Sequence, residues 1–256
     1  MPFDRIVLLA GKWDTTPIVY NFLQSNFHVE TVILEQKVAR KQFLRRRIKK
    51  LGWLNVLGQL LFQLFVARPL SRFSRARIEE IKAKYRLNNA DIPAEKIFPV
   101  MSVNSDTTVR KLQLLQPDLV VVHGTRIISK SVLQSTGAQF INIHAGITPR
   151  YRGSHGGYWA IANNDEKNCG VTVHLIDAGI DTGKVLAQAP ILVTRKDNFS
   201  TYPYLQLAEG LNLLRGVIKQ LESGGTPGVK NELNSALWHH PTLWGYLWRR
   251  LRKGVK

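Results

Sequence analysis

The sequence predicts an α/β fold, with a mostly parallel sheet and helices on both of its faces. Three segments support this prediction. Residues 5–11 have the pattern of an apolar strand that leads into a loop and then a helix from about Thr15 or Thr16 to Asn26. Residues 118–124 contain the run Leu-Val-Val-Val, which is typical of a parallel strand buried on both faces. Residues 140–144 form another strand pattern that ends at a loop, the place where open α/β sheets bind ligands.

Length and composition set the domain organisation that we expect. A chain of 256 residues with 44% apolar residues can bury one sizeable core, so residues 1–224 are expected to form one domain. A Gly-Gly-Thr-Pro-Gly turn from Gly224 then leads into an aromatic and basic tail at 225–256. Cys169 is the only cysteine, which excludes an intramolecular disulfide and indicates a reducing, cytoplasmic compartment. The apolar run at 6–10 is too short for a signal peptide.

The remaining elements follow from local signals. Strands are expected at 28–35 and 96–100, and the sixty residues between them exceed a simple crossover, so we expect a helical insertion over about 37–90. The other expected elements are a helix capped by Asp106 or Thr107, a short helix from Gly156, strands at 170–176 and 186–193, and a core-facing helix at 202–221.

The insertion combines an apolar helix with a strong positive charge. Residues 51–67 are almost wholly apolar, and Asn55, Gln59 and Gln63 recur at every fourth position, so that they form one narrow polar stripe. Between Lys37 and Arg86, fifteen lysines and arginines oppose two glutamates, a net +13 of the +18 on the chain. Seventeen residues with three amides argue against a membrane span and favour a helix in the headgroup region. A helix packed on the sheet edge or in a dimer interface is the alternative.

The tail has a similar composition. Trp238, Trp244, Tyr246 and Trp248 lie beside Arg249, Arg250, Arg252 and Lys253. Indoles next to basic residues favour an interfacial anchor, and an aromatic tail folded over its own domain is the alternative. We therefore expect an anionic partner for residues 45–77 and 238–253: phospholipid, nucleic acid or a phosphorylated substrate. The alternative is that these basic residues only form a solvent-exposed helix surface without a partner.

Polar residues with catalytic potential gather in two blocks. Asn142 and His144 are two residues apart at the end of a strand and should therefore share a face. Asp177 and Asp181 lie in the turn-rich loop that follows the strand at 170–176. An amide, an imidazole and a carboxylate without a nucleophilic serine or cysteine suit direct acyl transfer. The amide and the imidazole can stabilise an oxyanion, and the carboxylate can accept a proton from an attacking amine.

In these blocks the chain resembles the folate-dependent formyltransferases, the family of methionyl-tRNA, glycinamide ribonucleotide and sugar N-formyltransferases. The resemblance spans roughly residues 5–220. It rests on Asn142-x-His144, Pro149, Tyr151-Arg152-Gly153, Gly170-Val-Thr-Val-His174 and Asp181-Thr-Gly183, in that order. It implies a Rossmann-like domain that uses 10-formyltetrahydrofolate as co-substrate and no metal. It also implies that Asn142, His144 and Asp181 are the catalytic residues.

The resemblance assigns further residues to binding. For the cofactor these are Thr125, Arg126, Ile127 and Ile128, whose backbone would grip the pteridine, and the loop residues Asp177, Ala178, Gly179 and Ile180. For the substrate they are Tyr151, Arg152, Gly153 and His174, with a supporting hydrogen bond as the alternative role of His174. Alternatively, Arg126 faces solvent and Asp177 shapes the loop.

The acceptor is expected to be an amino sugar on a nucleotide or lipid carrier. Glycinamide ribonucleotide formyltransferases have a Gly-x-Gly-Ser-Asn-type phosphate loop where this chain has Gly11-Lys-Trp-Asp-Thr15. Methionyl-tRNA formyltransferases carry a C-terminal barrel domain, whereas a short tail follows Gly224 here. Both acceptors remain alternatives, and the enzyme would be cytoplasmic and peripheral at the inner face of the membrane. A non-catalytic basic module that binds membranes or nucleic acid is the alternative of another class.

Two other chemistries are disfavoured by the residues. His144, His155 and His174 could ligate zinc in principle, but no Cys or Glu accompanies them at the usual ligand spacing. Cys169 precedes a strand and has no obvious base beside it, so a thiol nucleophile is not expected.

Overall fold

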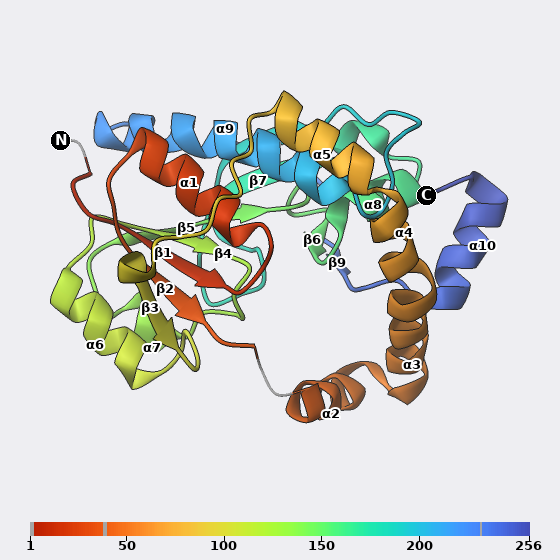
Figure 1. Cartoon of the computed structure of the whole chain (residues 1–256), viewed down its shortest axis with the longest axis horizontal. Coiled ribbons are helices and arrows are strands. Elements are labelled where there is room, and N and C mark those ends of the chain that lie inside the picture. Colours follow the sequence, from red (N-terminus) through yellow and green to blue (C-terminus); the bar gives the residue numbers. More distant parts are fainter. Residues whose placement is uncertain (1–2, 38–39, 231) are drawn as a thin grey trace.

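The fold is built on a seven-stranded sheet. A computed structural model describes residues 3–37, 40–230 and 232–256. The strand order is β3-β2-β1-β4-β5-β7-β8 (Figure 1). The strands are β1 (Ile6–Gly11), β2 (Val29–Glu35), β3 (Ile97–Val100), β4 (Leu119–His123), β5 (Gln139–His144), β7 (Gly170–Leu175) and β8 (Val185–Pro190). The first five are parallel, and β7 and β8 are antiparallel to their neighbours. The predicted mostly parallel α/β sheet is therefore confirmed.

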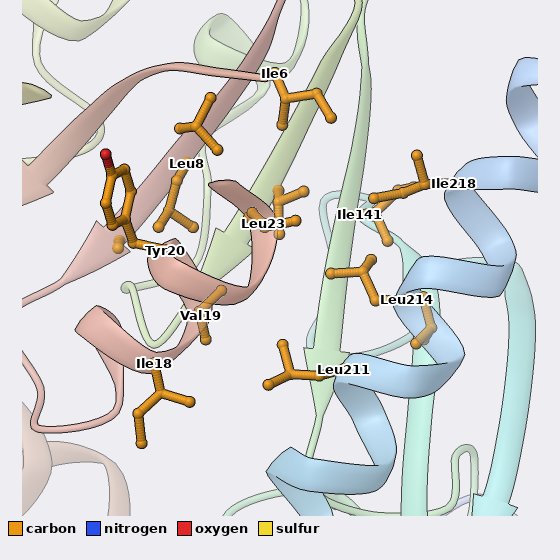
Figure 2. Close-up of a cluster of buried hydrophobic side chains, with 14 of the residues drawn as sticks. Ile6, Leu8, Ile18, Val19, Tyr20, Leu23, Ile141, Leu211, Leu214 and Ile218 are labelled. Carbon is orange, nitrogen blue, oxygen red and sulfur yellow. The ribbon is translucent and has the colours of Figure 1, made fainter. Parts of the chain in front are cut away.

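Helices cover both faces of the sheet. One face packs against α1 (Thr16–Asn26) and α9 (Tyr202–Glu222), and the other against α6 (Asp106–Leu115) and α7 (Lys130–Leu133). Alternate residues of each strand enter the two cores: Ile6 and Leu8 face α1 and α9, whereas Val7 and Leu9 lie in the opposite core. Figure 2 shows the first core, in which side chains of α1 and α9 meet those of the strands.

The cap of α6 differs from the expected one by a residue. Ser105, not Asp106 or Thr107, is the N-cap, and its hydroxyl accepts a hydrogen bond from the Thr108 N–H at 3.3 Å. Asp106 is the first helical residue, where its charge favours the positive end of the helix dipole.

Burial in the first core leads to a stability prediction. Leu211 of α9 is 1% exposed, and its replacement by alanine is expected to lower the free energy of unfolding by about 2–5 kcal/mol, because the site loses apolar contacts and keeps a cavity. Leu114 on α6 is 78% exposed, so Leu114→Ala should change that free energy by less than about 0.5 kcal/mol. Urea denaturation of both variants measures the difference. Equal losses would show that Leu211 is not a core residue.

The predicted insertion between the second and third strands is a helical arm. It comprises α2 (Arg40–Leu51), α3 (Trp53–Phe62), the π-helical turn η1 (Gln63–Ala67), α4 (Arg68–Phe73) and α5 (Arg75–Lys84). Gly52, with a φ of 82°, allows the turn between α2 and α3. In Figure 1 α2 and α3 lie on the side of the molecule away from α6 and α7. Within the described ranges, no helix has both the length and the apolar character that crossing a bilayer requires.

Gln59 and Gln63 of the predicted polar stripe face the protein, whereas Asn55 is exposed, and most of the large apolar side chains of α3 face solvent. Gln59 is 6% exposed; its Nε2 donates to the His240 carbonyl at 2.9 Å, and its Oε1 accepts from Arg47 Nε at 2.8 Å. Gln63 Nε2 lies 3.1 Å from His240 Nδ1. Phe62 anchors the same side of the helix in the core. The helix is thus oriented opposite to the usual amphipathic helix of a globular protein.

The tail packs against the domain. After the main domain come β9 (Leu237–Trp238), which pairs in parallel with β6 (Arg152–Gly153), and α10 (Leu243–Lys253). Trp238 stacks on Trp159 of α8 (Gly156–Ala162) with ring centroids 4.7 Å apart. The remaining short helices are η2 (Ala94–Lys96) and η3 (Glu166–Asn168). This packing brings the tail beside both the arm and the carboxyl edge of β5.

Candidate active site

The pairing of β5 with β7 brings the predicted polar residues together. Asn142 lies directly opposite His174, and His144 lies opposite Thr172. Ile141 and Val173 point into the core under α9, so the alternating residues Asn142, His144 and His174 share the other face. The amide and the two imidazoles therefore meet at the carboxyl end of β5, as the two-residue spacing predicted for the first pair.

His174 fixes the orientation of the Asn142 amide. His174 Nδ1 lies 2.7 Å from the Leu175 carbonyl oxygen, which can only accept, so Nδ1 donates. In the neutral ring Nε2 then accepts, and Asn142 Nδ2 donates to it at 3.2 Å. Asp181 Oδ1 lies 3.7 Å from the same Nε2, so the carboxylate gains an ion pair when the ring is protonated. One N–H of the amide is used in its bond to Nε2. The second N–H is left to donate into the cleft that Asn142 lines.

His144 is held between two acceptors. Its Nε2 donates to the Tyr151 carbonyl at 2.7 Å, and its Nδ1 lies 3.3 Å from Asp181 Oδ2. Burial lowers the pKa of His144 below its ordinary value, although the Asp181 carboxylate opposes this change. A proton between Nδ1 and Oδ2 would satisfy both atoms. The pair can therefore hold a proton that arrives from a reacting group.

Asp181 reaches the site because its loop folds back over the end of the sheet. The residue has a φ of 50°, and its Oδ2 accepts a hydrogen bond from the Gly153 N–H at 2.8 Å. Burial by itself would raise the pKa of Asp181, but its interactions with His174, His144 and the Gly153 N–H bring this pKa below the ordinary value. The carboxylate is therefore ionised at neutral pH.

Asp177 has a different environment. Its Oδ1 accepts hydrogen bonds from the Gly179 N–H at 2.9 Å and from the Thr182 hydroxyl at 2.7 Å. These bonds close the turn that carries Asp181. Gly183 lies so close to the Leu175 carbonyl that a side chain there would collide with it. Asp177 thus stabilises the loop, whereas Asp181 faces the histidines.

The polar residues line a cleft of about 420 Å³. Many predicted residues lie on its wall: Thr125, Arg126, Ile127, Ile128, Asn142, His144, Gly153, His174, Asp177, Gly179, Ile180 and Asp181. The wall also contains residues that sequence reasoning missed: Lys50 from α2, Ser154, and Leu237, Trp238 and His239 from the tail. No local motif marks this second set, because long-range packing of the arm and tail brings it to the cleft.

Three predicted residues do not line the cleft. The Tyr151 ring is buried, and its hydroxyl donates to Asp165 at 2.8 Å, so that only its backbone carbonyl contacts the site through His144. Arg152 donates to the Ile180 carbonyl at 3.2 Å and thereby ties β6 to the loop. Ala178 is not part of the wall.

Arg126 lines the cleft, but its guanidinium is directed to another partner. Its Nε lies 2.5 Å from Glu35 Oε1 at the end of β2. The same carboxylate oxygen accepts a hydrogen bond from the Val103 N–H at 2.9 Å. The side chain of Arg126 thus braces the segment at 124–128 and leaves that segment's backbone to face the cleft.

The other candidate groups lie apart from the trio. His123 interacts with the Thr15 hydroxyl at 2.9 Å, and burial lowers the pKa of His123 to about 4. His155 Nε2 lies 2.9 Å from His240 Nδ1. Burial raises the pKa of the Cys169 thiol to about 12, which leaves it protonated and a poor nucleophile. Across the described ranges, no group of three or more His, Cys, Asp or Glu residues is suited to a metal ion.

An open α/β sheet with an amide, an imidazole and a carboxylate around one cleft at its carboxyl edge has the site of an acyl-group transferase without a covalent nucleophile. The Formyl transferase family matches residues 75–210, more than half of the chain. The chain belongs to this family, and the predicted resemblance is confirmed.

Curated relatives and solved structures agree with this assignment. Methionyl-tRNA formyltransferase of Methylacidiphilum infernorum is 35% identical over 143 residues, 55% of this chain and 43% of that protein. This chain thus spans less than half the length of that relative. A sugar N-formyltransferase from a Shewanella species has a TM-score of 0.54 at 17% identity, covering 91% of this chain and 76% of that one. Phosphoribosylglycinamide formyltransferase from Streptococcus pneumoniae has a TM-score of 0.54 at 20% identity, and the match covers 86% of this chain and 99% of that one.

Proposed function

We propose that the protein transfers the formyl group of 10-formyltetrahydrofolate to a primary amine. The observation that carries this proposal is the convergence of Asn142, His144 and Asp181 on one cleft, within a chain of the formyl transferase family. The backbone at 124–128 and the loop at 177–180 would hold the folate, and apolar Val122, Ile128 and Ile176 on the wall suit a flat pteridine ring. When bound, this co-substrate supplies an activated formyl carbon.

The side chains have distinct roles in the transfer. The attacking amine forms a bond to the formyl carbon, and the bond from that carbon to the folate nitrogen breaks. Asn142 donates its second N–H to the oxyanion that develops in between, and the His144 ring beside it stabilises the same charge once a proton lies between its Nδ1 and Asp181 Oδ2. Asp181 accepts the proton that the amine loses, and the departing folate nitrogen takes up one proton.

His174 is expected to act through Asn142. His174→Phe removes the acceptor that orients the amide, so kcat should fall about fivefold, the equivalent of one hydrogen bond of about 1 kcal/mol. His174→Gln can still accept a hydrogen bond and should recover part of the loss. Steady-state kinetics of both variants measure kcat and KM separately. If the two variants lose the same activity, or if only KM rises, His174 does not position the amide.

The acceptor that we propose is the amine of an amino sugar on a nucleotide or lipid carrier. The loop after β1 argues against a ribonucleotide phosphate there: the Trp13 indole donates to the Gly124 carbonyl at 2.6 Å and covers Gly11 and Gly124. Backbone that an anion could approach is thus occupied by a ring. The tRNA acceptor named for the curated relatives is the second candidate, because the basic arm could contact phosphates.

An acceptor panel tests the proposed function. Release of tetrahydrofolate is measured with nucleotide-linked amino sugars, polyprenyl-phosphate amino sugars, charged initiator tRNA and glycinamide ribonucleotide, each with the wild type and with Asn142→Ala. Acceleration by an amino sugar that requires Asn142 supports the proposal. If none of the amines accelerates release, formyl transfer is wrong; if only tRNA does, the amino-sugar acceptor is wrong.

We also propose a peripheral location at the inner face of an anionic membrane, through residues 45–77 and 238–253. The outward-facing apolar side of α3 and the net positive charge of the arm support this location.

A further inference from the structure

Exposed apolar side chains gather on two neighbouring helical segments, one in the arm and one in the tail. On α3 and η1 they are 42–62% exposed: Trp53, Leu54, Leu57, Leu60, Leu64 and Phe65. On α10 they are Trp244, Leu247, Trp248 and Leu251, which are 44–86% exposed. The Trp244 ring lies on Gly58 and joins the two helices, which are neighbours in Figure 1. Ten large apolar side chains on one side of two helices form a surface that must be covered by a partner.

Basic residues lie on the helices that carry this apolar surface or adjoin them in the sequence. They lie on α2 (Arg45, Arg46 and Lys49), along α4 and at the start of α5 (Arg68, Arg72 and Arg75), and on α10 (Arg252 and Lys253). Within the described part of the chain, none of the first six forms an ion pair with a carboxylate. The sequence has no Asp or Glu between Glu35 and Glu79. A second copy of the chain would place these arginines against each other, whereas an anionic lipid surface would neutralise them.

Two cavities that share the wall residue His239 lie beside each other at the arm and the tail. Lys50 and His239 lie on the wall of the cleft that also contains Asn142. His239 also lines a second cavity, of about 290 Å³, whose wall includes Leu51, Asn55 and Arg249. The Arg249 guanidinium stacks over Trp159 at 4.9 Å. The first cavity therefore has the cation Lys50 on its wall and the second has Arg249, and both groups can bind a phosphate.

We propose that the acceptor amine is carried on a lipid phosphate, and that it enters the cleft from an anionic bilayer on which the apolar surface rests. This inference rests on the proposed formyl transfer. The sugar amine reaches Asn142 and Asp181, the phosphate lies near His239 with Lys50 and Arg249 as its cations, and the lipid tail stays in the bilayer. The helix that turns its glutamines inward thereby places lipid-binding residues beside the mouth of the site.

Vesicle binding tests the surface separately from catalysis. The full chain is sedimented with vesicles of phosphatidylcholine alone or with 30% phosphatidylglycerol, at low and high salt. Wild type and Leu114→Asp, a control on α6 with a similarly exposed leucine, are expected to bind the anionic vesicles. Leu251→Asp combined with Leu64→Asp should bind at least about tenfold more weakly, because charges replace two inserted side chains. Absence of wild-type binding, or equal binding of the double variant, would overturn the proposal, as would a dimer in light scattering that the double variant abolishes.

Acceptor choice tests the lipid carrier. Formyl transfer is measured with an amino sugar on polyprenyl phosphate in the anionic vesicles and with the same sugar on a nucleotide. We expect kcat/KM at least about tenfold higher for the lipid-linked sugar, a rise in its KM for Lys50→Ala, and a lower rate for the double variant but not for Leu114→Asp. Transfer to the nucleotide-linked sugar alone would overturn the lipid carrier and leave formyl transfer intact. Transfer to neither sugar, in wild type that binds vesicles, would overturn the lipid carrier; the acceptor panel then decides whether formyl transfer also fails.

Discussion

Replacing Asn142 with alanine is expected to lower kcat for formyl transfer by about a hundredfold or more. The amide is the group whose second N–H is free to donate to the developing oxyanion, since its first N–H is bonded to His174. Loss of one such donor removes about 3 kcal/mol of transition-state stabilisation, while binding of the folate and the amine should change little. Release of tetrahydrofolate at saturating substrate measures the effect.

Two further variants separate this role from a general loss of structure. Asn142→Asp has nearly the same shape, but its carboxylate cannot donate, so its kcat should fall at least as far. Asn26→Ala removes an exposed amide on α1 that bonds only to the Phe22 carbonyl, and it should keep full activity. Wild-type turnover in Asn142→Ala would eliminate the amide from the mechanism.

The second large effect is expected for Asp181→Asn, with a loss of about a hundredfold to ten-thousandfold in kcat. The amide keeps the size of the side chain and one oxygen for the Gly153 N–H, but it cannot take the amine proton. Asp177→Asn is the matched control four residues earlier, because its remaining oxygen can still accept from Gly179 and Thr182. Similar losses in the two variants would show that the loop, not the base, limits the rate.

The lowered pKa of Asp181 also sets a pH dependence. An unfolded aspartate titrates near pH 4, and the folded carboxylate titrates below that value, so its contribution to stability is complete above about pH 4 and disappears as the pH falls through the lower, folded pKa. The difference in free energy of unfolding between wild type and Asp181→Asn should therefore be larger at pH 7 than at pH 2.5. Chemical denaturation at the two pH values measures it, and a difference that grows on acidification would contradict the assigned ion pairs.

Local patterns were sufficient for much of the sheet and for the placement of Asn142 beside His144. The strands around Val7, Val121 and Ile141 could be predicted because each is a short apolar run with a turn signal at its end. The approach of Asn142 to His144 follows from the two-residue period of a strand. Asp181 could be assigned only through the family motif, since its distance from His144 depends on how the loop at 176–184 folds back.

Other features depend on packing between distant segments. The inward direction of Gln59 and Gln63 is decided by His240, some 180 residues later, which supplies a carbonyl and a ring nitrogen. Packing between distant segments also pairs β9 with β6 and places Lys50 and His239 on the wall of the cleft. A pattern read along the chain identifies the polar side of α3 but not what that side contacts.

The antiparallel pair of β5 and β7 carries polar residues of the candidate active site and is also part of the buried core. The amide at 142 and the imidazole at 174 sit on two strands in the interior of the sheet, directly across from each other, and Val173 and Ile141 beside them are wholly buried. Opening of this strand pair would require the core under α9 to open as well. Backbone amides there should exchange with solvent deuterium only through global unfolding, and the enzyme should lose its activity in a single step, with no partly melted form that is still able to catalyse.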